Sequence, residues 1–216
     1  GWIWEIPLWS RMGSGYVFSD KFVSVEDALK EFKRGLLKKG YKNVEDLEYR
    51  LMPMKCGIHS ELWAKNVCAI GLSAGFIEPL QSNGLHCVHE FLFNLTRILA
   101  QDRINQWDRQ CFTASCHYIF NTFTALINLT YTLSHRDDTE YWRQLENELG
   151  LSFCFYQKMI RGEFEEGAFP CTAAGLNWNP IDIHTLKYRG NGRNVLNDLD
   201  NNYGFYINQL NMRKKK

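Results

Sequence analysis

The first seven residues, Gly-Trp-Ile-Trp-Glu-Ile-Pro, form the pattern that most limits how this chain can fold. Side chains alternate between the two faces of a strand, so Trp2, Trp4 and Ile6 project to one side. Pro7 has no N–H to donate to a neighbouring strand, and it therefore suits a strand end or a sheet edge. Two interpretations fit this apolar face. It is half of a β-sandwich core, or it is a rigid wall that lines a site.

A second informative segment covers residues 66–86, where a short apolar run, 67–70, predicts a buried strand followed by small residues and a helix. The apolar residues of that helix recur at the three-and-four spacing of one buried face, and they are Leu85, Val88, Leu92, Leu95 and Leu99. Ser82 or Asn83 can cap the helix. Its free N–H groups and positive dipole end favour an electron-rich ring edge, a carbonyl or a halide ion. An ordinary strand–loop–helix connection explains the same pattern without a ligand.

The pattern along the chain predicts an α+β fold, in which antiparallel strands and a hairpin precede a mainly helical C-terminal part. Strands over residues 2–9 and 16–23 are expected to be joined by a turn at 12–15, which reads Met-Gly-Ser-Gly. Further strands are expected over 47–54 and 60–70, and helices from Ser24 to about Gly40 and over 83–100, 103–133, 138–147 and 150–161. We divide the chain into residues 1–80, an antiparallel β part with one helix, and residues 81–216, a helical part with a mobile basic tail.

Composition limits the function classes. The 216 residues are 45% hydrophobic, enough for a substantial core, and the net charge of +1 favours neither nucleic acid nor an anionic membrane as a partner. Seven cysteines, an odd number without repeated spacing, argue against a disulfide framework and for a reducing, cytoplasmic compartment. The first apolar run is short and interrupted by Glu5, so it predicts neither a signal peptide nor a membrane span.

Two more segments follow those at 1–7 and 66–86. One reads Arg-Asp-Asp-Thr-Glu-Tyr-Trp-Arg at 136–143, and the other reads Cys-Thr-Ala-Ala-Gly-Leu at 171–176, before Pro180. With these four segments in this order, the chain resembles the flavin-dependent halogenases of the tryptophan halogenase family. The resemblance implies a fragment of an FAD-dependent, monooxygenase-like fold. No Gly-x-Gly-x-x-Gly loop followed by a helix occurs, so we expect the chain to be the C-terminal portion of a longer protein.

The resemblance also implies a reaction. Reduced FAD, supplied by a separate flavin reductase, and oxygen oxidise a halide ion to hypohalous acid. The acid travels to a separate site, where a lysine activates it and a small, electron-rich aromatic substrate is halogenated. We expect that lysine in the N-terminal part of the family fold, outside this chain.

The resemblance assigns residues of this chain to three roles. The flavin-contacting residues are Gly71, Leu72, Ser73, Ala74, Pro79 and Gly84. The residues that line the passage to the substrate, and keep the substrate from the flavin, are Trp2, Trp4, Ile6 and Pro7. The catalytic residues are Gln81 and Ser82, with Ser82 at the halide and oxidant end. Residues 1–80 thus form the flavin- and substrate-facing part.

Two departures from the family pattern concern reactivity and substrate. Halogenases that act on tryptophan carry Glu-Pro-Leu-Glu-Ser, whereas this chain has Gln81 in place of the second glutamate. An amide keeps the shape and hydrogen bonding of a carboxylate but is not a base at neutral pH. Glu78 is expected to accept hydrogen bonds from loop N–H groups and not to replace that base. The lid before Cys171 is shortened to residues 162–170, so we expect an indolic, phenolic or heteroaromatic ring in place of free tryptophan.

Alternative functions stay open at this point. One is a non-catalytic remnant or binding module that keeps the fold without the chemistry, and another is a flavin-dependent monooxygenase. A zinc site built from Cys56, His59, His86 and His89 lacks a recognised ligand framework, so we expect no metal. No nucleophile-elbow pattern surrounds a serine, and a hydrolase therefore has no support.

Overall fold

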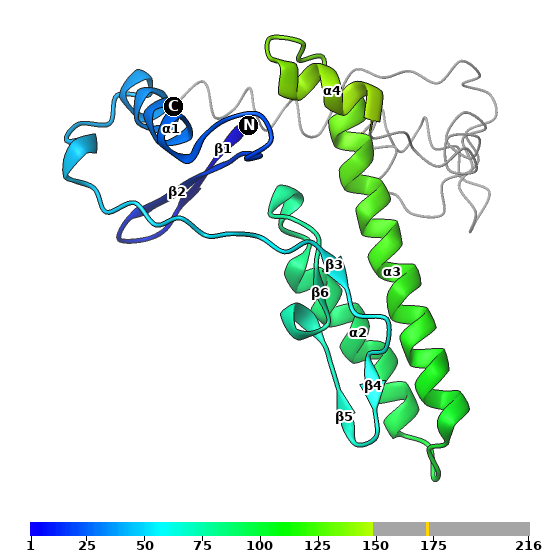
Figure 1. Cartoon of the computed structure of the whole chain (residues 1–216). Helices are drawn as coiled ribbons and strands as arrows, with labels where there is room; N and C mark the ends of the chain where they lie inside the picture. The colour runs from blue at the N-terminus through cyan, green and yellow to red at the C-terminus, as the bar shows by residue number, and fades with distance from the viewer. Residues whose placement is uncertain (149–171, 173–216) are drawn as a thin grey trace, which may run out of the picture. The chain divides into compact units, whose positions relative to one another are not determined.

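The computed structural model describes residues 1–148 and Thr172, which group into two compact units (Figure 1). The first unit comprises Gly1–Pro53 and His135–Glu148, and the second includes Met54–Ser134. The predicted division at residue 80 follows the change from strand to helix pattern, whereas the compact units divide after residues 53 and 134. Several predictions lie outside the described residues, namely the helix at 150–161, the shortened lid at 162–170, the segment at 171–176 apart from Thr172, and the basic tail.

The first unit begins with an antiparallel hairpin of β1 (Trp2–Pro7) and β2 (Met12–Val17). Trp2 pairs with Val17 at the open end of the hairpin. The predicted hairpin is confirmed, but the position of its turn was wrong. The turn lies at residues 8–11 in place of 12–15, and the second strand covers 12–17 in place of 16–23.

Cross-strand packing explains why residues 12–15 form a strand. Across the hairpin Gly15 pairs with Trp4, and Gly13 pairs with Ile6. A Cβ on Gly15 would overlap the Trp4 indole, so the missing side chain makes room for the ring. A run containing two glycines is typical of a turn. In this chain the glycines serve close packing inside a strand instead.

One helix covers the hairpin within the first unit. α1 (Val25–Lys38) begins at Ser24, whose hydroxyl accepts a hydrogen bond from the Asp27 N–H (3.1 Å). The Tyr16 ring of β2 stacks against Phe32 of α1, with 6.2 Å between the ring centroids. A short 3₁₀ turn, η1 (Val44–Asp46), follows α1, and α4 (Glu140–Glu148) completes the unit. The helices predicted from Ser24 and over 138–147 are therefore confirmed.

Within Met54–Ser134, the second unit contains four two-residue strands in two antiparallel pairs. β3 (Gly57–Ile58) pairs with β6 (Gly75–Phe76), and β4 (Trp63–Ala64) pairs with β5 (Val67–Cys68). The second pair lies inside the predicted range 60–70. The strand predicted over 47–54 was wrong: Leu47, Leu51 and Met52 are between 50% and 74% exposed, because their alternation meets no sheet.

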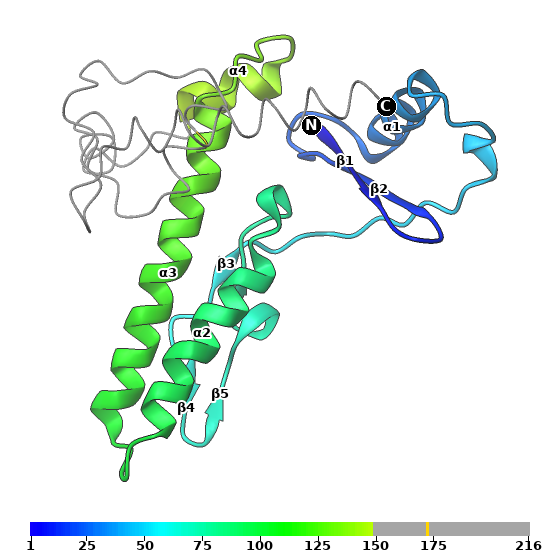
Figure 2. The ribbon, with the colours of Figure 1, turned by 180° about the vertical axis from the view of Figure 1, so that it is seen from behind.

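Two helices dominate the second unit, α2 (Gly84–Leu99) and α3 (Gln106–Thr132), and both were predicted. Figures 1 and 2 show α2 alongside α3 from opposite sides. β4 packs against α3, where the Trp63 ring meets the Phe112 ring edge to face (5.5 Å between the ring centroids). The buried core between these elements consists of Leu62, Trp63, Ala74, Phe91, Phe112 and Cys116. Two short 3₁₀ turns lie between the strands and α2, and they are η2 (Gly71–Ser73) and η3 (Leu80–Ser82).

The described residues thus combine antiparallel strand pairs with longer helices, which confirms the predicted α+β class. No helix within residues 1–148 is long and apolar enough to cross a membrane.

Candidate active site

The predicted site residues occupy two segments, one in each unit. Trp2, Trp4, Ile6 and Pro7 form most of β1 in the first unit. The flavin-contacting and catalytic candidates lie between Gly71 and Gly84 in the second unit. Each segment is described by itself below.

The two faces of β1 have different surroundings. α1 lies against the face that carries Ile3, because a Cβ on Gly35 of α1 would meet the Ile3 methyl group. Trp2, Trp4 and Ile6 share the opposite face, as the alternation of a strand requires. We call this surface the Trp face. Its two indoles are half-buried, whereas Ile6 is 49% exposed and lies at its open edge.

The Trp4 indole lies on the backbone of β2. A Cβ on Gly15 would fall within the ring, and a Cβ on Gly13 would stand 3.6 Å from the Trp4 Cζ3 atom. The Ser14 hydroxyl, between the two glycines, donates to the Trp4 carbonyl (2.9 Å). The missing side chains at positions 13 and 15 therefore determine where the indole lies.

The first part of the predicted flavin-contacting loop is η2. Gly71 has φ +60°, a backbone conformation that favours glycine, and it packs against the Val88 side chain of α2. Leu72 is 79% exposed, and Ser73 is exposed with its hydroxyl donating to a backbone carbonyl. Ala74 differs because it is fully buried in the core, where its side chain positions the loop.

The second part is the segment of residues 78–84, which we call the 78–84 bend. Gln81 and Ser82 both have left-handed backbone conformations, with φ of +61° and +54°. The Ser82 N–H donates to the Pro79 carbonyl (3.0 Å) and closes the turn. A non-glycine residue in this region costs on the order of 1–3 kcal/mol, and such strain persists only where the surroundings hold it.

The last turn of α3 supplies two hydrogen bonds that hold the 78–84 bend. Gln81 Nε2 donates to Thr130 Oγ1 (2.7 Å), and the Tyr131 hydroxyl donates to Glu78 Oε2 (2.9 Å). The partners are 49 and 53 residues apart along the chain. Two neighbouring residues of one helix thus restrain both arms of the strained turn.

Glu78 acts as a structural acceptor in this arrangement. Burial raises the pKa of its carboxyl group, while hydrogen bonds from the Tyr131 hydroxyl and the Leu80 N–H oppose that rise. The sequence predicted acceptance from loop N–H groups, whereas the partner that the structure shows within hydrogen-bond distance is the Tyr131 hydroxyl. Its other oxygen, Oε1, is buried and has no hydrogen-bond partner among residues 1–148.

The start of α2 is accessible from one side. Asn83 occupies the N-cap position, as predicted, but its side chain makes no capping hydrogen bond. This side chain is only 8% exposed, and its Nδ2 has no partner within residues 1–148. A Cβ on Gly84 would meet nothing within 4 Å. A flat ring edge or an anion therefore fits against the backbone at this helix start.

The histidines and cysteines considered for zinc have other surroundings. His117 Nε2 is hydrogen-bonded to the His59 carbonyl (2.8 Å), and the His86 ring packs against Phe123. Burial, and next to it the Glu78 carboxylate, raises the pKa of the Cys56 thiol, so this thiol stays protonated at neutral pH. In the part of the chain that the structure describes, no group of three or more His, Cys, Asp or Glu is arranged to hold a metal ion.

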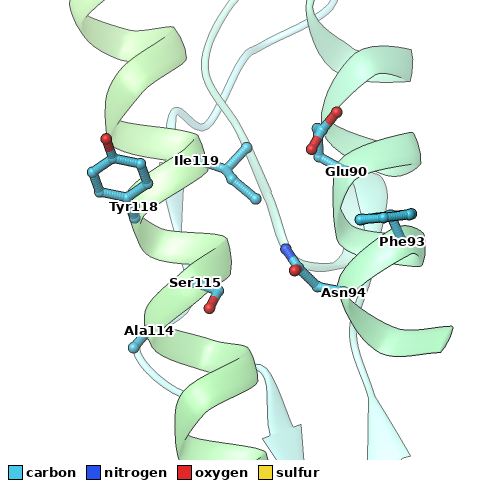
Figure 3. Close-up of a pocket in the computed structure, with 7 residues that line it drawn as sticks. All are labelled: Glu90, Phe93, Asn94, Ala114, Ser115, Tyr118 and Ile119. Atoms are coloured by element: carbon cyan, nitrogen blue, oxygen red, sulfur yellow. The ribbon is translucent and has the colours of Figure 1, made fainter. Parts of the chain in front are cut away.

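A separate groove of about 520 Å³ lies between α2 and α3 (Figure 3). In Figure 3, Asn94 and Ile119 point into the space between the helices. None of the predicted site residues lines this groove. Its first lining residue on α2, Glu90, lies about 9 Å of helix rise beyond Gly84, so the groove is distinct from the 78–84 bend.

Sequence reasoning missed three residues that position the site. Gly15 was assigned to a turn, and Thr130 and Tyr131 were treated only as part of a helix. The sequence contains no clear signal for the last two, since the same turn also carries the polar Asn128 between Ile127 and Leu129. Nothing in the spacing links that turn to residues 78 and 81.

Comparison with known proteins agrees with the motifs. The tryptophan halogenase family model matches residues 1–160. KtzR, a 7-chloro-L-tryptophan 6-halogenase from Kutzneria sp. (strain 744), is 32% identical over 143 residues, which are 66% of this chain and 27% of KtzR. KtzQ, a tryptophan 7-halogenase from the same organism, is 29% identical over 208 residues, 95% of this chain and 36% of KtzQ.

Solved structures give the same result. BrvH, a flavin-dependent halogenase from Brevundimonas sp. BAL3, matches with a TM-score of 0.72 and 30% identity over 84% of this chain and 38% of BrvH. The chain thus spans between 27% and 38% of the length of these three relatives. The family match covers both the Trp face and the 78–84 bend. This chain belongs to the tryptophan halogenase family.

Proposed function

We propose that this chain is the C-terminal, substrate-side portion of a flavin-dependent halogenase. The full-length protein would halogenate an electron-rich aromatic ring with reduced FAD, oxygen and a halide ion. The observation that carries the proposal is the 78–84 bend, where Gln81 and Ser82 are held in left-handed conformations beside an uncapped helix start. Family membership supports the same class of reaction.

The second unit offers surfaces for the isoalloxazine ring. Leu72 and Ser73 present exposed atoms, Gly71 gives the loop its turn, and Gly84 leaves the backbone of α2 open. Pro79 shapes the entry to the bend, and Ala74 holds the loop from the core. When bound, reduced FAD would supply two of the four electrons that oxygen accepts, and the halide would supply the other two as it becomes hypohalous acid.

Gln81 and Ser82 are the proposed residues of the reaction site. Both are exposed, and the Ser82 hydroxyl can donate a hydrogen bond to a halide ion or accept one from an oxidant. Gln81 orients a partner through its amide but takes no proton at neutral pH. The proton of the cationic ring intermediate must therefore leave to another base, which favours slow turnover or strongly activated rings.

The Trp face is proposed to be a wall of the passage to the substrate. Trp2, Trp4 and Ile6, with Pro7 at the end of β1, offer apolar surface with no ionisable group, which protects a reactive oxidant from nucleophiles. A rigid wall of this kind also keeps the substrate from the flavin and so separates halogenation from hydroxylation. The shortened lid expected from the sequence favours an indole, a phenol or a heteroaromatic ring over free tryptophan.

Two other functions are distinguished by one experiment. The full-length protein is supplied with FAD, a flavin reductase with its reductant, bromide and indole, and the products are separated and weighed by mass spectrometry. A monobrominated product, absent without bromide, supports the proposal. A hydroxylated product identifies a monooxygenase. No modified ring, from folded protein that still binds its ligands, identifies a non-catalytic binding module, for which the non-basic Gln81 is the specific argument.

A further inference from the structure

We infer that Thr130 is a positioning residue that sets the orientation of the Gln81 side chain. It holds the amide nitrogen against α3 and leaves the carbonyl oxygen available as a hydrogen-bond acceptor at the reaction site. The inference rests on the proposed function, which gives Gln81 its place at the reacting groups. Thr130 lies outside the family motifs, and its role specifies that Gln81 presents its amide oxygen to the reacting groups.

The Thr130 hydroxyl has a single proton to donate. That hydroxyl donates to the Leu126 carbonyl one turn earlier in α3 (3.0 Å). Only its lone pairs remain for Gln81, and a contact of 2.7 Å to them requires an N–H donor. The side-chain nitrogen of Gln81 must therefore face Thr130.

The side-chain amide of Gln81 is planar. Its oxygen and nitrogen are attached to the same carbon in one plane, so fixing the nitrogen also fixes the oxygen. Gln81 is exposed, and its Oε1 accepts no hydrogen bond from any other described residue. This oxygen is thus presented to solvent or to a bound donor.

The backbone that carries the Gln81 side chain is also held in place. Left-handed conformations at Gln81 and Ser82 give the chain a sharp turn, and the hydrogen bond from Tyr131 to Glu78 holds the arm that enters it. The amide therefore cannot reverse through a shift of the whole loop. Reversal requires rotation of the side chain and loss of the bond to Thr130.

The fixed amide oxygen keeps the ability of a carboxylate to accept a hydrogen bond, but it lacks the basicity of a carboxylate. The amide oxygen accepts a hydrogen bond from a donor, either the O–H of hypohalous acid or the N–H of an indole ring. It cannot accept the proton itself. Thr130 therefore supports orientation of the reacting groups without supplying acid–base chemistry.

The test uses the full-length protein and four variants. Thr130→Val and Thr130→Ala remove the hydroxyl, so that one of them remains informative if the other does not fold. Thr130→Ser keeps it. Thr124→Val is the matched control, because the Thr124 hydroxyl donates in the same way to a carbonyl of α3, that of Phe120 (2.9 Å), and has no hydrogen bond to the 78–84 bend.

The first readout does not depend on activity. In protein labelled with ¹⁵N-glutamine, the side-chain NH₂ signals of Gln81 are identified by their absence in Gln81→Glu. We expect the hydrogen-bonded proton of this pair to shift upfield in Thr130→Val or Thr130→Ala, and to stay in place in Thr130→Ser and Thr124→Val. Unchanged Gln81 signals after removal of the Thr130 hydroxyl overturn the inference.

The second readout is the bromination rate with indole and with N-methylindole. Loss of one positioning hydrogen bond should lower kcat about three- to tenfold with KM nearly unchanged, and Thr130→Ser should restore it. A lower kcat with both substrates shows that the Gln81 amide oxygen accepts a hydrogen bond from the oxidant. A lower kcat with indole alone shows that this oxygen accepts a hydrogen bond from the indole N–H. If the wild type brominates and Thr130→Val has the same kcat, the inference is wrong. If the wild type brominates neither ring, the proposed function fails while the spectra still decide the amide orientation.

Discussion

The Trp face and the 78–84 bend reach a fixed geometry by opposite means. On the Trp face, the Trp4 indole lies where β2 has no side chains, at Gly13 and Gly15. In the bend, two strained residues are kept in place by side-chain hydrogen bonds to α3. The first depends on what is missing from the sequence, and the second depends on polar atoms that are present.

This difference determines which substitutions should destabilise each region. Packing against bare backbone is sensitive to an added methyl group, since the backbone cannot move aside. A strained turn held by hydrogen bonds is sensitive to the removal of an oxygen atom, and relief of its strain should stabilise it. Substitutions in the two regions test these expectations, and they are given in order of decreasing effect.

The largest effect is expected on the Trp face. Gly15→Ala should lower the free energy of unfolding by about 1–3 kcal/mol, because the new methyl group overlaps the Trp4 indole. Gly13→Ala is the matched control, since its Cβ would meet the same ring at an ordinary 3.6 Å and should change stability by less than about 0.5 kcal/mol. Urea unfolding monitored by tryptophan fluorescence measures both. Equal effects of the two substitutions would show that Trp4 does not lie on Gly15.

A smaller effect is expected from Tyr131→Phe, which removes the donor to Glu78. The variant should lose about 1–2 kcal/mol of unfolding free energy at neutral pH, because a half-buried carboxylate loses a partner. In the Glu78→Leu background, which has no acceptor at this position, the same substitution should cost much less. Chemical unfolding of the wild type, the two single variants and the double variant gives the coupling free energy between Tyr131 and Glu78. If Tyr131→Phe costs as much stability without the Glu78 carboxylate as with it, the hydrogen bond between these residues is not the cause.

The pH dependence of this variant follows from the raised pKa of Glu78. In the folded state the carboxyl holds its proton above the ordinary pKa of 4.5, so its contribution to stability is complete below that value and is lost as the pH rises through the folded-state pKa. Removal of the Tyr131 hydroxyl raises this pKa further. The difference between Tyr131→Phe and wild type should therefore grow as the pH rises from 4 toward neutral.

The smallest effect is expected from relief of strain in the bend. Ser82→Gly should raise the free energy of unfolding by roughly 0.5–1 kcal/mol, since glycine adopts a positive φ freely but loses more entropy on folding. Ser82→Ala keeps the strain and should give no gain. Thermal unfolding compares the two, and a loss of stability in Ser82→Gly would mean that the turn is not strained.

The sequence predicted the elements whose residues repeat at a regular spacing. The alternation of Trp2, Trp4 and Ile6 predicted β1, and the apolar period from residue 85 to 99 predicted α2. The turn at 12–15 was misplaced because Met-Gly-Ser-Gly has the composition of a turn, whereas its glycines are explained by an indole on the facing strand. Local composition does not reveal which side chain lies across a hairpin.

The candidate site was predicted where it depends on local chemistry. Glu78 was predicted to be a structural acceptor, and it accepts a hydrogen bond from the Tyr131 hydroxyl; the role of Gln81 rests on the motif and stays a prediction. Thr130 and Tyr131 could not be predicted, because their contacts join residues about 50 positions apart through tertiary packing. No periodicity or spacing within one helix encodes such a contact.

The central claim is that Gln81 lies at the reacting groups of a halogenase and lacks only basicity. The most direct measurement is the turnover of Gln81→Glu in the full-length protein with bromide and indole, with Gln110→Glu, an exposed residue of α3, as the charge-matched control. We predict that turnover rises in Gln81→Glu, toward the ~100-fold that a positioned base contributes at the low end of its range, and does not change in Gln110→Glu. An unchanged rate in folded Gln81→Glu would contradict the account.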